Sequence, residues 1–252
     1  MKNNTKIYFV SDAHLGIDDK YSSDYRERLL IKWLDKIRSD ATEIVLAGDI
    51  FDFWFEYKHV VPAGFYKLIS KLRELSDSGI KLTYFTGNHD MWIFKYLPKA
   101  IGAELVRGIQ TREINGKKLY IGHGDGLGPY DKQYNFLKRI FSSKFFQFLF
   151  KTIHPEISFR IARKWSSTSR SKHKYPENID YNEEWLVKYS KSVLETEPFD
   201  FFVFGHRHIP FQIKLNDQSN FTNLGDWLFN FSYAVFDGTQ LELKFFDPDI
   251  EN

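Results

Sequence analysis

Five short polar motifs recur along this chain, and each follows or ends an apolar run of the length of a β-strand. Polar residues that follow parallel strands gather at one edge of a sheet, where α/β folds bind their ligands. The chain is therefore constrained to an α/β fold that brings the motifs together. In order, they are Asp12-Ala13-His14, Gly48-Asp49-Ile50-Phe51-Asp52, Gly87-Asn88-His89-Asp90, Gly122-His123-Gly124-Asp125 and Gly205-His206-Arg207-His208.

The first third of the chain alternates strand-like and helix-like patterns. Ile7–Val10 and Ile44–Ala47 are typical of buried strands, and Lys81–Thr86 of a third. Apolar residues at helical spacing predict helices over Asp24–Arg38 and about Ala63–Ser76. This order implies parallel strands joined by helical crossovers.

The remaining strand-like runs differ, because several are joined by short turns. Glu104–Glu113 and Lys117–Gly122 flank Asn115-Gly116, a strong hairpin signal. We expect a single domain over residues 1–252 with a mixed α/β core, two facing sheets and helices outside. The later strands are predicted at Phe201–Phe204, Phe211–Leu215, Ser232–Phe236 and Gln240–Phe245.

Residues 131–197 interrupt the strands with helical character, and we expect them to form an inserted cap. From Lys132 to Lys174 there are 11 Lys and Arg residues but one acidic residue, Glu156, whereas the rest of the chain holds 24 basic and 32 acidic residues. The same stretch is rich in Phe. A basic, aromatic block is thus set into an acidic protein.

The composition excludes several kinds of chemistry. The chain has no cysteine, so it has no disulfide, no thiolate zinc site and no cysteine nucleophile. Its N-terminus does not resemble a signal peptide, and no stretch approaches the roughly 20 apolar residues of a membrane span. We expect a cytoplasmic protein that can touch the inner membrane surface.

Carboxylate and amide oxygens together with imidazole nitrogens suit borderline divalent ions. The Asp12-x-His14 and His206-x-His208 spacing directs both side chains of each pair to one face of an extended chain. Any one motif alone is more often turn chemistry or a surface pair. Five in one chain predict a site for two metal ions, which can clamp both oxygens of an in-line displacement at phosphorus.

The ordered set resembles the calcineurin-like metallophosphoesterases, over roughly residues 7–227. The resemblance implies a four-layer αββα sandwich and two divalent ions, Mn²⁺ first, with Fe, Zn or Mg as alternatives. It implies a catalytic pair in which Asp90 orients His89, while Asp52 and Asp125 either support ligand imidazoles or cap turns. It also implies that one ion is held by Asp12, His14, Asp49 and His208, and the other by Asp49, Asn88, His123 and His206.

Within that family, the segment after His123 is similar to the UDP-2,3-diacylglucosamine pyrophosphatases of lipid A biosynthesis. This implies cleavage of a UDP-sugar bearing two acyl chains into UMP and an acylated sugar 1-phosphate. The chain departs from the proteobacterial enzymes at His89 and Ser166, where they carry Arg, and at Asp226, where they carry Ala. The implied substrate contacts are Asn88, His89, Asp131, Tyr134, Arg163, Ser169, Lys172 and His206.

Two other classes remain open. A nuclease or cyclic-nucleotide phosphodiesterase could use the same metals, with the aromatic cap stacking bases. The confinement of basic charge to one Phe-rich block argues against a nucleic-acid partner. A non-catalytic interaction module would be expected to have lost motif residues, and this chain retains them all. No obligate protein partner is evident, and an amphipathic nucleotide-sugar or a phospholipid-like molecule fits the cap best.

Overall fold

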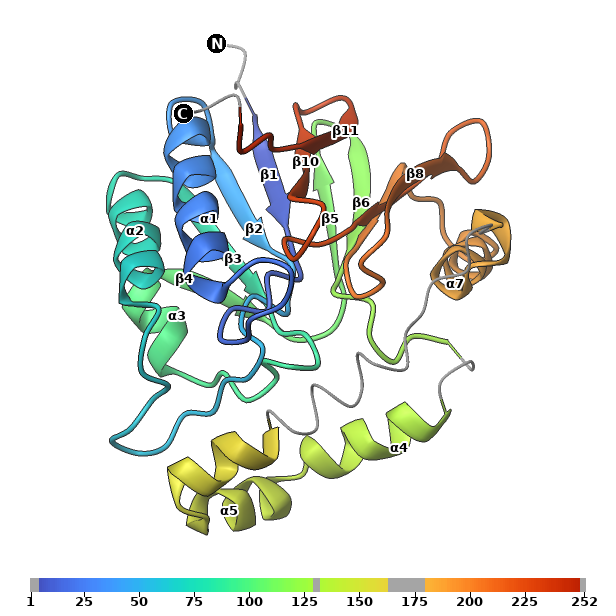
Figure 1. Ribbon diagram of the computed structural model, residues 1–252. Coiled ribbons are helices and arrows are strands. Elements are labelled where there is room, and N and C mark those ends of the chain that lie inside the picture. The colour runs from blue at the N-terminus through green and yellow to red at the C-terminus, as the bar shows by residue number, and fades with distance from the viewer. Residues whose placement is uncertain (1–4, 129–131, 163–179, 250–252) are drawn as a thin grey trace.

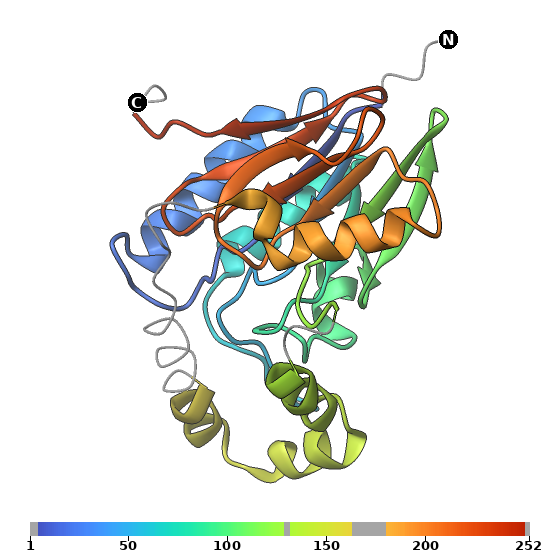
Figure 2. The same ribbon diagram turned by 90° about the vertical axis from the view of Figure 1, so that its right-hand side faces the viewer.

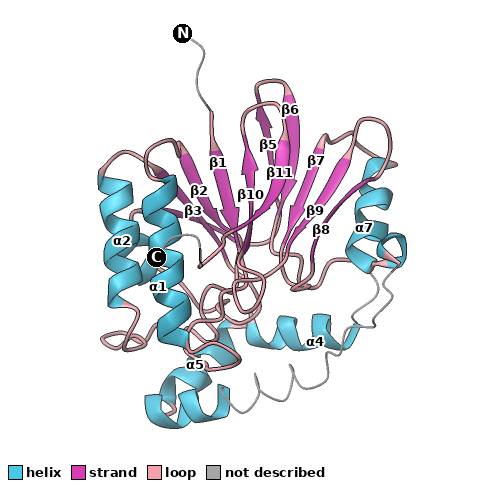
Figure 3. Ribbon diagram, turned by 45° about the horizontal axis from the view of Figure 1, so that its top comes forward, coloured by secondary structure: helices cyan, strands magenta, loops and turns pink. Residues whose placement is uncertain are grey.

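The computed structural model describes residues 5–128, 132–162 and 180–249, which form four layers (Figure 1). The two inner layers are β-sheets that face each other, and helices cover their outer faces (Figure 3). This architecture confirms the expected αββα sandwich.

The first sheet combines parallel and antiparallel strands. Its four parallel strands β1 to β4 are joined through α1 (Ser23–Ile37), α2 (Tyr66–Asp77) and α3 (Tyr96–Ile101). Two antiparallel strands extend it beyond β1. In spatial order the strands are β11 (Leu241–Phe245), β10 (Ser232–Phe236), β1 (Ile7–Val10), β2 (Glu43–Leu46), β3 (Lys81–Phe85) and β4 (Ala103–Val106).

The second sheet is also mixed. Helix α7 (Trp185–Leu194) packs on its outer face, preceded by the short helix η1 (Tyr181–Glu183). Strands β6, β7 and β9 run parallel, and the two edge strands are antiparallel to their neighbours. The order is β5 (Gln110–Ile114), β6 (Lys117–Ile121), β7 (Phe201–Phe204), β9 (Asn220–Leu224) and β8 (Pro210–Lys214).

Strand β1 shows how the layers are held. Successive side chains of a strand point to opposite faces. Ile7 and Phe9 therefore join the apolar cluster between the sheets, whereas Tyr8 and Val10 join the cluster under helices α1 to α3. All four are buried, which explains why this strand has no polar alternation.

Three features differ from the sequence prediction. The predicted strand Glu104–Glu113 is two strands in different sheets, because Gly108 takes a left-handed backbone conformation (φ 81°) where the chain crosses over. Strand β9 and helix α3 were not predicted. Helix α2 begins at Tyr66 rather than near Ala63, since the preceding residue, Phe65, is left-handed (φ 57°).

Helices α4 (Lys132–Phe141) and α5 (Lys144–Thr152), with helical residues 155–162, stand apart from the sandwich (Figures 1 and 2). They lie beyond the edge at which the parallel strands end. Helix α7, in contrast, belongs to the core although it falls within residues 131–197. The division of the chain into a core and a cap of those bounds stays a prediction.

Two kinds of aromatic residue are found on α4 and α5. Phe141 and Phe150 pack on Trp92 of the core, with ring centroids 5.7 and 4.5 Å away. Phe136, Phe145 and Phe148 are instead 66%, 63% and 65% exposed, and we call these three residues the exposed aromatic face. None of the described helices is long and apolar enough to cross a membrane.

Candidate metal centre and active site

The motif residues meet where the two sheets come together. Asp12 and His14 follow β1, Asp49 follows β2 and Asn88 follows β3, all in the first sheet. His123 follows β6, and His206 and His208 follow β7, in the second sheet. The site is therefore built from both sheets.

Two groups of ligand atoms converge, each with members from both sheets. In the first, Oδ1 of Asp12 lies 3.7 Å from Nε2 of His14 and 3.4 Å from Nε2 of His208. In the second, Asp49, His123 and His206 each place one ligand atom within 4.8 Å of the others.

Asp49 connects the two groups. Its Oδ2 lies 3.8 Å from Nε2 of His14 and 3.2 Å from Nε2 of His123. The side-chain oxygen of Asn88 is 3.3 Å from the same His123 nitrogen. The arrangement fits a carboxylate shared by two ions, with Asn88 beside the second.

Three ligands, Asp12, Asp49 and His123, are oriented by a bond from their other polar atom to the main chain. The N–H of His206 donates to Oδ2 of Asp12 at 2.9 Å, and Nδ1 of His123 bonds the carbonyl of Ala47 at 2.9 Å. The remaining atoms then face the shared centre. Among the described residues, buried Oδ1 of Asp12 and Nε2 of His14 have no hydrogen-bond partner. Buried polar atoms normally have a hydrogen-bond partner, and an oxygen and a nitrogen without one are suited to coordinate a divalent ion.

The backbone at the site is strained. Left-handed φ values are rare for residues other than glycine and cost of order 1–3 kcal/mol each. Such strain persists only where the surrounding structure enforces it, and it concentrates at functional sites. The residues concerned are Asp12 (φ 54°), His14 (42°), Asp49 (53°), His206 (68°) and His208 (55°).

The glycines before the ligands allow close approach between motifs. A Cβ on Gly87 would lie 2.2 Å from Oδ1 of Asp49, and one on Gly205 would lie 2.4 Å from Oδ2 of Asp12. No side chain fits at either position, because real Cβ contacts are not this short. The glycines that precede Asn88 and His206 thus let different motifs share one centre.

The charges at the site attract cations. Burial would raise the pKa of Asp12, but the imidazoles of His208 and His123 outweigh it and lower that pKa to about 2. Burial lowers the pKa of His208 to about 3 and, with the charge on His123, the pKa of His206 to about 4. The carboxylate of Asp12 is thereby kept ionised and the imidazoles of His206 and His208 neutral, which are the forms that bind metal. Burial opposes the charged form of His14 and His123, but the neighbouring carboxylates outweigh it, so the pKa of His14 is raised to about 10 and the pKa of His123 is raised well above its ordinary value. Metal binding at these two residues would therefore release protons.

His89 lies at the edge of this centre, with its ring 4.6 Å from that of His14. The resemblance assigns the orientation of this ring to Asp90, but the structure places Asp52 there. Nδ1 of His89 bonds the main-chain carbonyl of Asp52 at 2.9 Å and lies 3.5 Å from its carboxylate. His89 also forms a third group of converging atoms with His14 and Asp49.

Asp90 is buried, and its hydrogen bonds in the described structure do not reach the ring of His89. Its carboxylate accepts hydrogen bonds from the N–H of Gly87 at 2.8 Å, the N–H of Ile50 at 3.0 Å and the hydroxyl of Tyr84 at 2.5 Å. Burial, with the nearby charge of Asp49, raises the pKa of Asp90 to about 6. Asp90, in the third motif, therefore connects the backbone of the second motif to that of the third.

Carboxylates also stand behind the ligand histidines. Oδ1 of Asp52 lies 3.4 Å from Nδ1 of His14, and Oδ2 of Asp226 lies 3.8 Å from Nδ1 of His208. Asp125 instead pairs with Lys138 of α4, with 2.6 Å between its Oδ2 and Nζ. Asp226 had no predicted role, although its position just after β9 repeats the strand-end pattern of the motifs.

The predicted substrate contacts divide into two groups. Asn88, His89 and His206 lie at the metal centre described above. Asp131, Arg163, Ser169 and Lys172 lie outside the described residues, as does Ser166, and Tyr134 falls on α4 in a part where side chains are not described. Their roles stay predictions.

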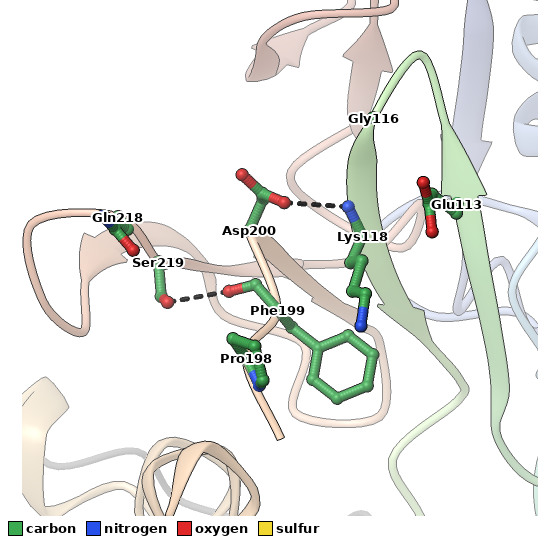
Figure 4. Close-up of a pocket in the computed structure, with 8 residues that line it drawn as sticks. All are labelled: Glu113, Gly116, Lys118, Pro198, Phe199, Asp200, Gln218 and Ser219. Atoms are coloured by element: carbon green, nitrogen blue, oxygen red, sulfur yellow. Dashed lines mark hydrogen bonds between the residues drawn. The ribbon is translucent and has the colours of Figure 1, made fainter.

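A separate hollow of about 180 Å³ lies where β6 and β7 begin (Figure 4), whereas the metal ligands follow the other ends of these strands. Its polar groups bond one another. The N–H of Lys118 donates to Asp200 at 2.8 Å, and the hydroxyl of Ser219 donates to the carbonyl of Phe199 at 2.7 Å. This hollow is no part of the metal centre.

Comparison with known proteins agrees with this site. A family model described as calcineurin-like phosphoesterase matches residues 5–210. A UDP-2,3-diacylglucosamine hydrolase of Porphyromonas gingivalis is 39% identical, over 95% of this chain and 97% of that protein. A protein of the same name from Pseudomonas fluorescens is 29% identical, over 88% of this chain and 87% of that protein.

Among solved structures, an archaeal phosphodiesterase is 12% identical with a TM-score of 0.49, covering 96% of this chain and all of that one. The family model spans most of the chain, and the P. gingivalis relative spans nearly all of it at well over 30% identity. The chain therefore belongs to the calcineurin-like phosphoesterase family.

Proposed function

We propose that the protein hydrolyses the pyrophosphate of UDP-2,3-diacylglucosamine to UMP and 2,3-diacylglucosamine 1-phosphate. The observation that carries this proposal is the 39% identity, over 95% of the chain, to a protein named UDP-2,3-diacylglucosamine hydrolase. The convergence of the motif side chains at one centre supports a hydrolytic rather than a purely structural role.

Calcineurin-like phosphoesterases use divalent metals, and the converging ligand atoms offer places for two ions. We assign Mn²⁺ to both, since the donors are oxygen and nitrogen without sulfur. When bound, two such ions would activate a water and neutralise charge on the phosphoryl oxygens. One ion would be held by Asp12, His14, Asp49 and His208, and the other by Asp49, Asn88, His123 and His206.

The remaining chemistry falls to His89. Its side chain is 15% exposed, and Nδ1 is engaged by the carbonyl of Asp52, so Nε2 is the nitrogen that can meet the substrate. There it would bind the phosphoryl oxygen or pass a proton to the departing group. Asp52 would hold the ring in place, while Asp90 supports the loop beneath it.

The cap would receive the acyl chains. The exposed aromatic face on α4 and α5 offers apolar surface, and exposed Lys144 and Lys151 flank it with positive charge. An amphipathic substrate needs both, and so does contact with an anionic membrane surface. We therefore propose that the protein works at the inner membrane face, where this substrate class resides.

A direct assay tests the proposal. Purified protein with Mn²⁺ is given UDP-2,3-diacylglucosamine, and the release of UMP is followed by chromatography. A nitrophenyl phosphodiester, a cyclic nucleotide and single-stranded DNA serve as comparison substrates. Preferred cleavage of the acylated UDP-sugar supports the proposal. Faster cleavage of DNA or of the cyclic nucleotide would replace it with the nuclease or phosphodiesterase alternative.

A further inference from the structure

Arg26 on α1 is a fully buried arginine whose hydrogen bonds all go to main-chain carbonyls among the described residues. Its guanidinium donates to the carbonyls of Ala13, His14 and Ile17, and Nε donates to that of Tyr21. A buried charge normally requires strong compensation. Here one planar group with five donors spans the loop that carries the first metal motif.

The N–H groups of that loop are bound from the other side. Asp12, His14 and Leu15 donate to the carbonyls of Gly48, Asp49 and Ile50, at 3.0, 3.0 and 2.9 Å. Main-chain bonds to the second motif thus fix one side of the loop. Of the loop's carbonyls, those of Ala13, His14 and Ile17 accept hydrogen bonds from Arg26. The carbonyls of Asp12 and Leu15 accept instead from the N–H groups of Trp227 and Asp52.

The loop needs this support because its backbone is strained. Asp12 and His14 both have left-handed φ values, of 54° and 42°. Such a conformation relaxes unless the surroundings enforce it. If His14 relaxed, its Nε2 would leave its place beside Asp12 and Asp49.

We propose that Arg26 is a positioning residue for one of the two metal ions, the one assigned to Asp12, His14, Asp49 and His208. Within the described part of the chain it bonds no ligand side chain, and it acts through the carbonyls around His14. The ligands of the other ion follow β2, β3, β6 and β7, and the hydrogen bonds of Arg26 in the described structure reach none of these strands. The inference rests on the ligand sets of the proposed function.

Arg26→Met and Arg26→Lys test this role. Methionine fills similar space without donors, and lysine keeps the charge but cannot span three carbonyls. Arg112→Met is the matched control, because Arg112 is a mostly buried arginine that bonds Glu43 at 2.6 Å, at the start of β2, and Thr83 at 3.2 Å, in the middle of β3. Both positions should affect stability, but only Arg26 should affect metal binding.

Mn²⁺ binding is measured by calorimetric titration and by electron paramagnetic resonance, which distinguishes a coupled pair of ions from a single one. In the Arg26 variants we expect one ion to bind with unchanged affinity and the other about 10- to 100-fold more weakly, the usual effect of losing outer support for ligands. At equal Mn²⁺ the coupled signal should give way to that of a single ion. Arg112→Met should keep the coupled signal.

Other results would contradict either the role of Arg26 or the proposed ligand sets on which it depends. Two ions bound at wild-type affinity in a folded Arg26 variant would overturn it, and so would an equal loss of both ions. If Arg26→Met does not fold, Arg26→Lys carries the same comparison. The rise in melting temperature at saturating Mn²⁺ should also shrink in the Arg26 variants but not in Arg112→Met. If the wild-type protein itself fails to bind two ions, the proposed ligand sets fail instead.

Discussion

The main-chain N–H of His89 donates a hydrogen bond to Oδ1 of Asp49 at 2.8 Å, across 40 positions of sequence. This bond turns the second carboxylate oxygen of Asp49 toward both His14 and His123. The third motif therefore orients the one carboxylate that joins the two proposed ions.

Asp49→Ala is expected to remove both ions and nearly all activity, because no other proposed ligand serves both. Metal content is measured by elemental analysis after gel filtration. Asp77→Ala is the control, since Asp77 is an exposed carboxylate paired with Arg73 on α2, and it should retain two ions per chain. Two ions in Asp49→Ala would refute the shared-carboxylate assignment.

His89→Ala is expected to retain both ions and to lower kcat by about 10²- to 10⁴-fold, the usual range for a positioned acid–base group. Metal content and steady-state kinetics are measured on the same preparation. Because His89 lies close to His14 and Asp49, the loss of an ion is the informative alternative. It would make His89 a ligand rather than a catalytic residue.

Asp90→Ala is expected to destabilise the metal-free protein by about 2–5 kcal/mol, because buried donors left without an acceptor cost about 1–3 kcal/mol each. Urea unfolding in the presence of chelator measures this loss. Asp237→Ala removes similar bonds from an exposed turn, where water can replace the carboxylate, and should cost less. An unchanged free energy of unfolding with a large loss of kcat would favour the catalytic pairing of Asp90 with His89 instead.

The double substitution Phe145→Ser with Phe148→Ser is expected to reduce kcat/KM for long-chain substrates more than for short-chain ones, with little change in melting temperature. Both residues are exposed, so they contribute little to stability. In the unsubstituted enzyme each methylene in contact should change kcat/KM by up to about fourfold, from about 0.8 kcal/mol.

Phe150→Ser is the control for the double substitution. Because Phe150 packs on Trp92 of the core, its replacement should lower the melting temperature. Absence of any chain-length dependence in the intact enzyme would remove the acyl-binding role of the cap. The nuclease and phosphodiesterase alternatives would then move ahead.

Much of the fold could be predicted because its strands are short and strongly apolar. The predicted strands Ile7–Val10, Phe201–Phe204 and Ser232–Phe236 match the structure residue for residue. Strand β9 was missed because its sequence, NFTNL, is half polar, and only its central place between β7 and β8 buries it. The split of Glu104–Glu113 depends on which sheet each half joins, and local pattern carries no such information.

At the site, the sequence predicted which residues converge but not how their second contacts are arranged. Asp90 directly follows His89 in the sequence, and Asp52 ends the preceding motif. Asp52 faces the ring because its carbonyl bonds Nδ1 of His89, whereas Asp90 is engaged by Ile50, Tyr84 and Gly87. These bonds join different motifs, and local sequence does not specify them.

Each proposed ion has ligands from both sheets, so it would hold together two halves of the sandwich that are otherwise joined by apolar packing and by polar bonds such as that of Arg112 to Glu43. Since the unfolded chain has no such site, binding energy becomes folding energy. Each tenfold rise in free ion above its dissociation constant would then add about 1.4 kcal/mol per site to the stability of the fold. In a cell short of the metal, the enzyme would lose its activity and also its stability, and the less stable protein would be more readily degraded by proteases.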